Sequence, residues 1–404
     1  MIFVFYFFAA VLIFLGCKSL RGGIDYLAFF KRELARPESD FTPFCSIIAP
    51  CRGLDFDLKK NLAALFRQNY PRYEIVFAVD DERDEAVKII KEVLRENAKF
   101  AKLFVAGKAE NESQKVHNLR HAVREVSGES KAFVFVDSDA RPNENWLRNL
   151  IAPLRDEKIG TATGYRWFVP KKNNLASLLR VVWNASIASS LGANEKNNFC
   201  WGGAMAIRRE TFEKTNVREN WRGTLSDDFT VTRLMKKANL PIRFVPQCLT
   251  ATVEDCTFRE LVEFTNRQMK ITRCYAAHLW KASLIGSLLF AATFWTGVAL
   301  LFVLSGVHFW LTLVFVTVIF LLGAAKAQLR LKAVRLVLID YEKQLNRQIF
   351  SHLTLWTITP ILFFYNCVCA LFSRKIIWRG IEYNLKSAAE TEILSKRQIV
   401  KLRS

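Results

Sequence analysis

The stretch "AFVFVDSD", residues 132–139, is an apolar run that ends directly in two carboxylates, Asp137 and Asp139. An unbroken run of Phe and Val is typical of a strand that is buried on both faces of a parallel sheet. Ligands of such sheets bind beyond the carboxyl ends of the strands. The stretch therefore predicts a central strand whose end carries functional carboxylates.

Apolar runs and amphipathic helices alternate on the amino-terminal side of this stretch. The expected strands cover 44–53, 73–81, 101–107 and 132–139, and the expected helices cover 58–68, 84–97 and 114–126. The alternation predicts an α/β fold in a domain over residues 42–275, with a Rossmann-like, mostly parallel sheet covered on both faces. Neither a GxGxxG nor a GxxxxGK[ST] motif follows any of these strands, so dinucleotide-binding and P-loop classes lose their main support.

Long apolar segments flank this domain and predict an integral membrane protein. Residues 1–20 are expected to form an amino-terminal transmembrane helix, and the following Lys18 and Arg21 favour a cytoplasmic location for the next part of the chain. A cleaved secretory or lipoprotein signal ending at Cys17 is the alternative. That alternative lacks the positive charges that such signals carry before the apolar run.

The carboxy-terminal part predicts further membrane elements. Residues 282–325 are expected to form a transmembrane hairpin, and residues 326–350 a basic amphipathic helix lying on the membrane. The segment 353–372 contains Pro360 and either crosses the membrane or re-enters; re-entry is preferred, because it keeps the basic tail, 373–404, on the cytoplasmic side. A further interfacial helix is expected over 174–192.

Composition narrows the partners and the compartment. The 404 residues carry a formal net charge of +20, which favours anionic partners such as nucleotide phosphates, acidic lipids or nucleic acid. The nine cysteines form no CxxC pair, which disfavours a zinc site or a disulfide framework and fits a reducing, cytoplasmic environment.

The acidic pair at 137 and 139 has two interpretations. Two carboxylates one residue apart at the end of a strand can hold a divalent cation, with Asp139 as the metal ligand and Asp137 turned toward a bound ligand. Alternatively, Asp139 and Asn143 only turn the chain before the next helix. A metal held here would neutralise a diphosphate.

Several motifs resemble those of the membrane-bound, inverting family 2 glycosyltransferases, closest to the ceramide glucosyltransferase-like branch. They are "APCRGLD" (49–55), "FAVDD" (77–81), "SQKVHNL" (113–119), the Asp-x-Asp at 137–139, "GTLSDDFTVTRLM" (223–235), "NRQMKITRCY" (266–275) and "IIWRGIEYNL" (376–385). The resemblance runs from Pro50 to about Leu385 and implies a GT-A fold and transfer of a sugar from a UDP-sugar.

The resemblance also implies roles for individual residues. Asp228 would be the catalytic base, with Asp227 beside it, and Asp139 and Asp137 would hold Mg²⁺ or Mn²⁺. The implied donor-binding residues are Pro50, Arg52, Asp80, Asp81, Lys115, Asn118, Asp137, Ser138, Trp201, Gly202, Gly203, Arg267, Gln268, Lys270 and Arg273. The family's Gln/Arg-x-x-Arg-Trp motif is altered here, since Lys270 and Ile271 replace its Arg and Trp. The loss of the tryptophan disfavours a processive polysaccharide synthase. Trp378, Arg379 and Gly380 would close the site from beneath.

Purely structural roles are the alternative at three of these sites. Ser226, Asp227 and Asp228 also form an ordinary helix N-cap with favourable charges. The glycines at 202 and 203 could mark a bulge in a buried strand, and Lys270 and Arg273 could be anchors before a membrane helix.

The sequence thus predicts an inverting, metal-dependent hexosyltransferase that moves a sugar, with glucose as the first candidate, from a UDP-sugar to a membrane lipid such as ceramide, at the cytoplasmic face. A processive polysaccharide synthase is the alternative enzyme. A basic membrane-surface protein that binds nucleic acid or anionic lipid is the alternative of another class; the acidic strand ends disfavour it, and we expect no nucleic-acid partner.

Overall fold

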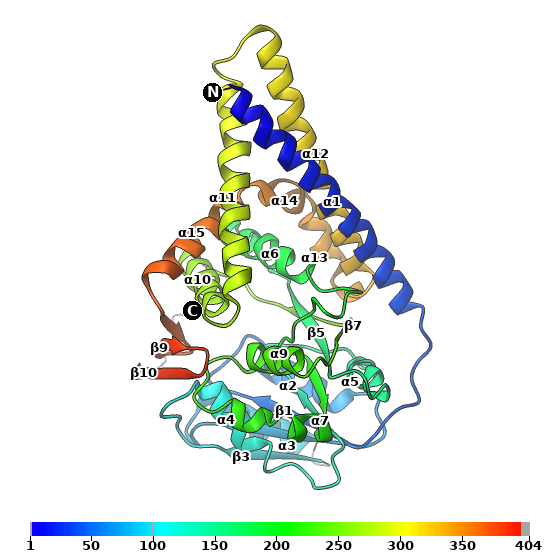
Figure 1. Ribbon diagram of the computed structural model, residues 1–404. Helices are drawn as coiled ribbons and strands as arrows, with labels where there is room; N and C mark the ends of the chain where they lie inside the picture. Colours follow the sequence, from blue (N-terminus) through cyan, green and yellow to red (C-terminus); the bar gives the residue numbers. More distant parts are fainter. Residues whose placement is uncertain (1, 98–99, 397–404) are drawn as a thin grey trace. The chain divides into compact units, whose positions relative to one another are not determined.

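A computed structural model describes residues 2–97 and 100–396 (Figure 1). The chain divides into two compact units. One consists of residues 1–32, 168–189 and 254–373, and the other of residues 33–167, 190–253 and 374–404. The first holds the long apolar helices and is called the membrane unit; the second holds the sheets and is called the sheet unit.

A seven-stranded sheet with the order β3-β2-β1-β4-β6-β5-β7 forms the centre of the sheet unit. Its strands are β1 (Cys45–Pro50), β2 (Tyr73–Val79), β3 (Ala101–Val105), β4 (Ala132–Phe135), β5 (Thr161–Phe168), β6 (Met205–Arg208) and β7 (Ile242–Thr252). Strands β3, β2, β1 and β4 are parallel, whereas β6 runs antiparallel to both β4 and β5. The predicted mostly parallel α/β sheet is therefore confirmed, and each of the four strands expected up to residue 139 is present.

Helices of the sheet unit join and cover these strands. They are α2 (Leu58–Ala64), α3 (Glu85–Glu96), α4 (Gln114–Ala122), α5 (Trp146–Ile151), α7 (Arg209–Lys214), α8 (Val217–Asn220) and α9 (Asp227–Lys237), with 3₁₀ turns η1 (Leu65–Arg67) and η2 (Ala152–Arg155). Side-chain caps fix three of the helix starts, because Asp84, Ser113 and Ser226 accept hydrogen bonds from backbone N–H groups in the first turns of α3, α4 and α9.

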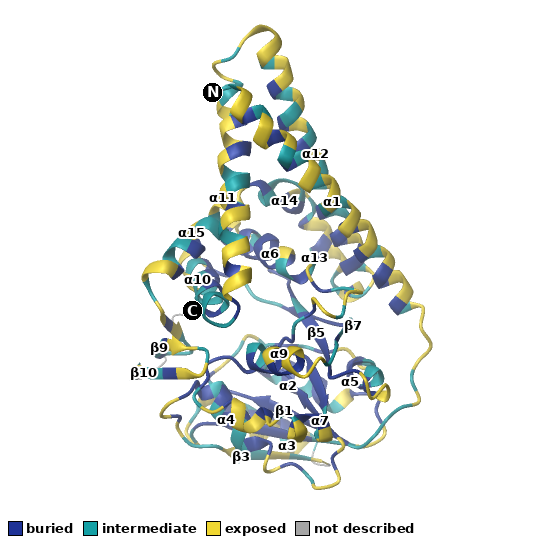
Figure 2. Ribbon diagram, viewed as in Figure 1, coloured by how far each residue is buried: buried dark blue, intermediate teal, exposed yellow. Residues whose placement is uncertain are grey.

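The main core packs α4, α8 and α9 against one face of the sheet. One buried cluster contains Val76 of β2, Phe135 of β4, Val116 of α4, Val217 of α8 and Val231 of α9. Alternate strand residues point to the other face, as the pleat requires. Buried residues follow the strands in Figure 2. Because helices cover both faces of the sheet, the carboxyl ends of the parallel strands remain as its accessible edge.

A second, three-stranded antiparallel sheet follows in the carboxy-terminal segment of the same unit. It comprises β8 (Lys375–Trp378), β9 (Ile381–Ser387) and β10 (Glu390–Lys396) in the order β10-β9-β8. Residues 373–404 are expected only as a basic tail, so this sheet is not predicted; residues 397–404 lie outside the described residues. Arg379 and Gly380 form the turn between β8 and β9 with φ of 50° and 75°, and two consecutive positive φ angles favour glycine at the second position.

Among the described residues, three helices of the membrane unit are long and apolar enough to cross a bilayer. They are α1 (Ile2–Leu34), α11 (Ala277–Leu300) and α12 (Gly306–Arg335). Their outward surfaces carry exposed apolar side chains, such as Phe3 at 77% and Trp310 at 64% exposure (Figure 2). Such surfaces suit lipid rather than water. The three long helices and their exposed apolar surfaces identify a membrane protein.

The remaining helices of this unit are shorter. They are α6 (Leu175–Ala188), α10 (Phe258–Tyr275), η3 (Ile339–Tyr341), α13 (Glu342–Arg347), α14 (Ile349–Thr354), η4 (Leu355–Thr357) and α15 (Thr359–Phe372). Residues 349–357 and 359–372 form a pair of helical segments bent by 54°, which is either one broken span or a re-entrant loop. The bend falls just before Pro360, which cannot donate the backbone hydrogen bond that a continuous helix needs.

Two expected helices differ from the structure. Residues 326–350 do not form one amphipathic helix, because α12 continues through Arg335 and the chain then breaks into η3 and α13. Helix α6, expected at the interface, is instead buried on most of its surface, and its Trp183 stacks on Phe363 with ring centroids 4.7 Å apart. Its apolar residues therefore serve packing within the unit.

Candidate active site

The carboxyl end of β4 and the start of α9 meet at one lysine. Lys115 of α4 places its Nζ atom 2.7 Å from Oδ1 of Asp137 and 3.1 Å from Oδ1 of Asp227. The ammonium is mostly buried, with 13% of its side chain exposed, so it bridges carboxylates that are far apart in the sequence. The predicted residues 115, 137 and 227 thus lie together.

Electrostatics explain how three ionisable groups share this place. Burial alone would lower the pKa of Lys115, but the carboxylates of Asp137, Asp227 and Asp228 outweigh it and raise the pKa. Burial raises the pKa of Asp227 to about 7. Lys115 acts against this rise, and the neighbouring carboxylates of Asp228 and Asp137 add to it. For Asp137 the same lysine outweighs burial and lowers the pKa. Near neutral pH the cluster therefore holds a charged lysine, a charged Asp137 and an Asp227 close to its titration point.

Asp228 lies beside this cluster at the first turn of α9. Its Oδ2 accepts a hydrogen bond from the backbone N–H of Gly202 at 3.2 Å, and its Oδ1 accepts from the N–H of Phe229 at 2.7 Å. Asp228 is half-buried, whereas Asp227 is 2% exposed. Of the two neighbouring carboxylates, Asp228 is the one that a ligand can reach. The N-cap reading of Ser226 is also correct, so the helix start holds the carboxylate rigidly.

The paired glycines allow this close packing. A Cβ atom on Gly202 would lie 2.2 Å from Oδ2 of Asp227 and 2.7 Å from Nζ of Lys115, and one on Gly203 would lie 2.2 Å from the ring of Trp201. Residues 202–204 form a turn and a bend directly before β6, so the two glycines precede this strand and do not form a bulge within it. Glycine is required here by space.

An aromatic and cationic group joins Asp139 to the same region. Arg166 of β5 lies 3.6 Å from Oδ2 of Asp139, and its guanidinium stacks over Trp201 at 5.1 Å from the ring centroid. Tyr165 packs against the same tryptophan, with ring centroids 5.6 Å apart. Sequence reasoning missed Arg166; the signal was a single charged residue inside the apolar strand "TATGYRWF".

The ends of β1 and β2 carry a second network. Arg52 forms an ion pair with the buried Asp80 and donates from Nε to the carbonyl of Arg379 at 3.2 Å. Arg379 in turn pairs with Asp55, whose Oδ2 accepts from Oγ of Ser138 at 2.5 Å. Since Ser138 adjoins Asp137, this network is continuous with the lysine cluster. Pro50 ends β1 immediately before it.

Two predicted residues lie outside these networks. Asp81 accepts from the backbone of Arg83 at 3.0 Å and lies 3.2 Å from Nζ of Lys108, and the bonds from Arg83 and Lys108 lower its pKa. Asn118 is buried at 1% exposure and hydrogen bonds to the carbonyl of Ala78 at 3.3 Å, so it ties α4 to β2.

Glu112, which sequence reasoning also missed, connects the loop before α4 to the loop before α9. It accepts from Nη1 of Arg120 at 2.7 and 2.8 Å and from the N–H of Gly223 at 3.1 Å. Gly223 has φ of 77°, and a Cβ there would lie 2.6 Å from the carbonyl oxygen of Ala389, so glycine is needed. Nothing in the local sequence marked Glu112 as different from other acidic residues.

The four predicted residues near 270 belong to α10, in the membrane unit. Lys270 donates to Oγ of Ser373 at 3.4 Å, and burial lowers the pKa of Lys270. Arg273 donates to the carbonyls of Ala370 and Leu371 at the end of α15, the latter at 3.2 Å. Arg267 and Gln268 lie on the same helix. Their predicted role in donor binding stays a prediction.

The described residues contain no group of three or more His, Cys, Asp or Glu side chains able to hold a metal ion. This does not disagree with the predicted site, since Mg²⁺ is usually held by one or two carboxylates together with substrate phosphates. Asp137 and Asp139 supply two such carboxylates, one residue apart, at the strand end. The donor set fits an ion that is completed by a diphosphate.

Comparison with known proteins identifies the family of the chain. Residues 4–391 match the model of glycosyl transferase family 21. Ceramide glucosyltransferase 3 of Caenorhabditis elegans is 34% identical over 199 residues, which are 48% of this chain and 42% of that protein. The ceramide glucosyltransferase of Candida albicans is 28% identical over 132 residues, 29% of this chain and 24% of that protein.

These alignments span less than half the length of the two relatives. Among solved structures, the mannosyltransferase PcManGT of Pyrobaculum calidifontis in complex with GDP-Man and Mn²⁺ gives a TM-score of 0.48 at 17% identity, over 90% of this chain and 99% of that one. The family match covers nearly the whole sequence. The chain therefore belongs to glycosyl transferase family 21.

Proposed function

We propose that this protein is an inverting glycosyltransferase that moves glucose from UDP-glucose to a ceramide-like lipid alcohol at the cytoplasmic face of a membrane. The family membership and the ceramide glucosyltransferases among its relatives support the reaction class and the acceptor. One observation carries the site assignment. Lys115 gathers Asp137 and Asp227 within 3.1 Å, next to an accessible Asp228.

In the proposed reaction the acceptor hydroxyl attacks the anomeric carbon as the bond from that carbon to the diphosphate oxygen breaks. Asp228 takes the hydroxyl proton, because an alcohol is a poor nucleophile until a carboxylate removes its proton. Attack from the face opposite the leaving diphosphate inverts the configuration. Asp227 stays beside it as a buried partner that orients Lys115.

Positive charge beside the leaving diphosphate is the second requirement. Lys115 stays charged because its neighbours raise its pKa, so it can stabilise negative charge that develops on the phosphate. A divalent ion held by Asp139 and Asp137 would neutralise the same charge. Arg52 and Asp80 are the proposed contacts for the base and ribose of the donor, and Trp201 is the proposed stacking surface for the sugar.

Purified protein incubated with labelled UDP-sugars and with ceramide, diacylglycerol or a sterol-like alcohol tests the proposal. We expect one labelled lipid from UDP-glucose and ceramide, and a product of single-sugar length, which excludes processive synthesis. Asp228→Asn should lower kcat by about 10²- to 10⁴-fold. Asp156→Asn, at an exposed carboxylate of the same unit, is the control and should keep full activity. Full transfer by Asp228→Asn would refute the base assignment.

Metal dependence is tested separately. Chelation with EDTA should abolish transfer, and Mg²⁺ or Mn²⁺ should restore it, whereas Asp139→Asn should need a higher metal concentration for half-maximal activity. Unchanged activity after exhaustive chelation would remove the metal from the proposal and leave Lys115 as the main cationic group.

A further inference from the structure

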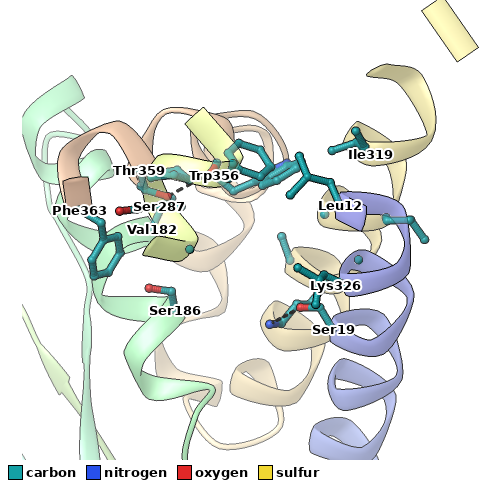
Figure 3. A pocket seen from close by; sticks show the side chains of 18 of the residues that line it. Leu12, Ser19, Val182, Ser186, Ser287, Ile319, Lys326, Trp356, Thr359 and Phe363 are labelled. Atoms are coloured by element: carbon teal, nitrogen blue, oxygen red, sulfur yellow. Dashed lines mark hydrogen bonds between the residues drawn. The ribbon is translucent and has the colours of Figure 1, made fainter. Parts of the chain in front are cut away.

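The membrane unit contains a cavity of about 640 Å³ between its helices. Helices α1, α6, α11, α12 and α15 and the η4 turn contribute to its wall (Figure 3). The wall is mostly apolar and includes Leu12, Phe290, Ile319 and Trp356. Gly286 of α11 faces open space, because a Cβ atom there would have no neighbour within 4 Å. A cavity of this size accommodates part of a lipid.

Two basic side chains of α12, Lys326 and Arg330, line the same cavity one helical turn apart. Nζ of Lys326 donates to Oγ of Ser19 at 2.7 Å (Figure 3). Arg330 is 5% exposed, and its Nε has no hydrogen-bond partner among the described residues. Within the described chain, no carboxylate forms an ion pair with either cation. A buried charge without a partner is costly, so the pair favours an anion in the cavity.

The position of these cations along the helices corresponds to a membrane surface. The first 20 residues of α12, from Gly306, are apolar or uncharged and span about 30 Å, the thickness of the hydrocarbon core. Lys326 follows directly. The apolar part of α1 likewise ends at Cys17, two residues before Ser19, the hydrogen-bond partner of Lys326. Both helices therefore lose their apolar character at the same level.

Helices α1 and α12 run in the same direction. Phe5 contacts Phe315 near their starts, with ring centroids 6.4 Å apart, and Ser19 contacts Lys326 further along. From the basic end of the cavity, Leu12 and Ile319 continue toward the apolar halves of the two helices. The cavity thus combines a cationic end at headgroup level with an apolar wall at acyl-chain level.

We propose that this cavity binds a phospholipid with an anionic headgroup, whose phosphate contacts Lys326 and Arg330 and whose acyl chain lies along Leu12, Ile319 and Phe290. The neutral headgroup of a ceramide-like acceptor would leave both cations unpaired. Charge complementarity therefore favours the anionic lipid over the acceptor as the occupant.

Binding of lipids to the delipidated full-length protein in neutral detergent tests this, with phosphatidylglycerol and phosphatidylcholine of equal chain length. Native mass spectrometry counts bound lipids and thermal unfolding measures their effect. We expect phosphatidylglycerol to bind tighter and to raise the Tm. Lys326→Met and Arg330→Met should each weaken its binding about five-fold. Lys332→Met, at an exposed position of the same helix, is the matched control and should leave binding unchanged. Equal binding of both lipids, or an equal loss in Lys332→Met, would overturn the proposal.

Two further measurements separate the lipid site from folding and from the acceptor site. Arg330→Met should keep or raise the Tm in lipid-free detergent, because it removes an unpaired buried charge, while the rise in Tm caused by phosphatidylglycerol becomes smaller. Gly286→Leu should fill the cavity and weaken phosphatidylglycerol binding without lowering that Tm. If ceramide displaces phosphatidylglycerol one for one, the cavity is an acceptor site and the proposal is wrong. These readouts need no turnover, so they stand whether or not the proposed reaction is correct.

Discussion

Nζ of Lys115 lies 2.7 Å from Oδ1 of Asp137, a contact that joins the end of the central strand β4 to the helix that follows β3. The same ammonium reaches Asp227 at 3.1 Å. One cation thus sets the geometry of the acidic groups around it.

Gly202→Ala should damage the cluster through space alone. The added Cβ would overlap Oδ2 of Asp227 and Nζ of Lys115, so we expect a loss of about 1–3 kcal/mol in stability and about a 10²-fold loss in kcat. Gly128→Ala is the control, since its Cβ would meet nothing within 4 Å. Thermal unfolding and steady-state kinetics measure the two effects, and a fully active Gly202→Ala would show that the cluster tolerates displacement.

The pH dependence of stability should report Asp227. Its pKa is raised to about 7 in the folded protein, against about 3.9 in an unfolded chain. The folded state therefore holds this proton more tightly, and the stability gained from it is lost as the pH rises through about 7. Each unit of difference between the two pKa values corresponds to about 1.4 kcal/mol.

Thermal unfolding at pH 5, 6, 7 and 8 measures this effect. The Tm of the unsubstituted protein should fall more between pH 5 and pH 8 than the Tm of Asp227→Asn, in which the titrating group is absent. The pKa of Lys115 is raised and lies above this pH range, and the pKa of Asp137 is lowered and lies below it. Neither group therefore changes its charge during the measurement. Parallel curves for the two proteins would contradict the raised pKa.

Glu112→Gln should loosen the loop that carries the proposed base. The substitution keeps the size of the side chain but removes the charge that pairs with Arg120, at a cost of about 2–3 kcal/mol. Because Glu112 also holds Gly223, we expect a lower kcat as well. The exposed Glu110→Gln is the matched control. A loss of stability without any change in kcat would mean that the loop keeps its position unaided.

Arg379→Asn tests the turn of the carboxy-terminal sheet. Asparagine tolerates the positive φ at this position, so the change removes mainly the contacts to Asp55 and Arg52. We expect the donor KM to rise about 10-fold with a smaller effect on kcat. Arg374→Asn, in the same segment, should leave KM unchanged. The opposite pattern, a lower kcat at constant KM, would place Arg379 in the chemical step.

Much of this fold could be predicted because its first half is locally consistent. The runs that became β1 to β4 are continuously apolar, and Asp84, Ser113 and Ser226 mark helix starts by their own side chains. The antiparallel pairing of β6 could not be predicted in this way, since strand direction leaves no trace in hydrophobic periodicity.

The candidate site was predictable where a motif carried it and not where tertiary contact did. Asp137, Lys115 and Asp228 stand in recognisable motifs and lie together in the structure. Arg166 and Glu112 act through neighbours that are distant in sequence; only the charge of Arg166 inside an apolar strand is a local signal, and Glu112 has none. Asn118 stands in a motif but fills its hydrogen bonds within the core.

The docking of the last strands has a consequence for biosynthesis. Gly223 approaches the turn at Ala389, and Tyr383 of β9 accepts a hydrogen bond from the N–H of Gln114 at 3.2 Å. The ribosome makes β9 and β10 after the strands of the main sheet and the membrane helices. A nascent chain that does not yet contain β9 and β10 therefore lacks the contacts that hold the loop before α9 and the start of α4 in the folded protein.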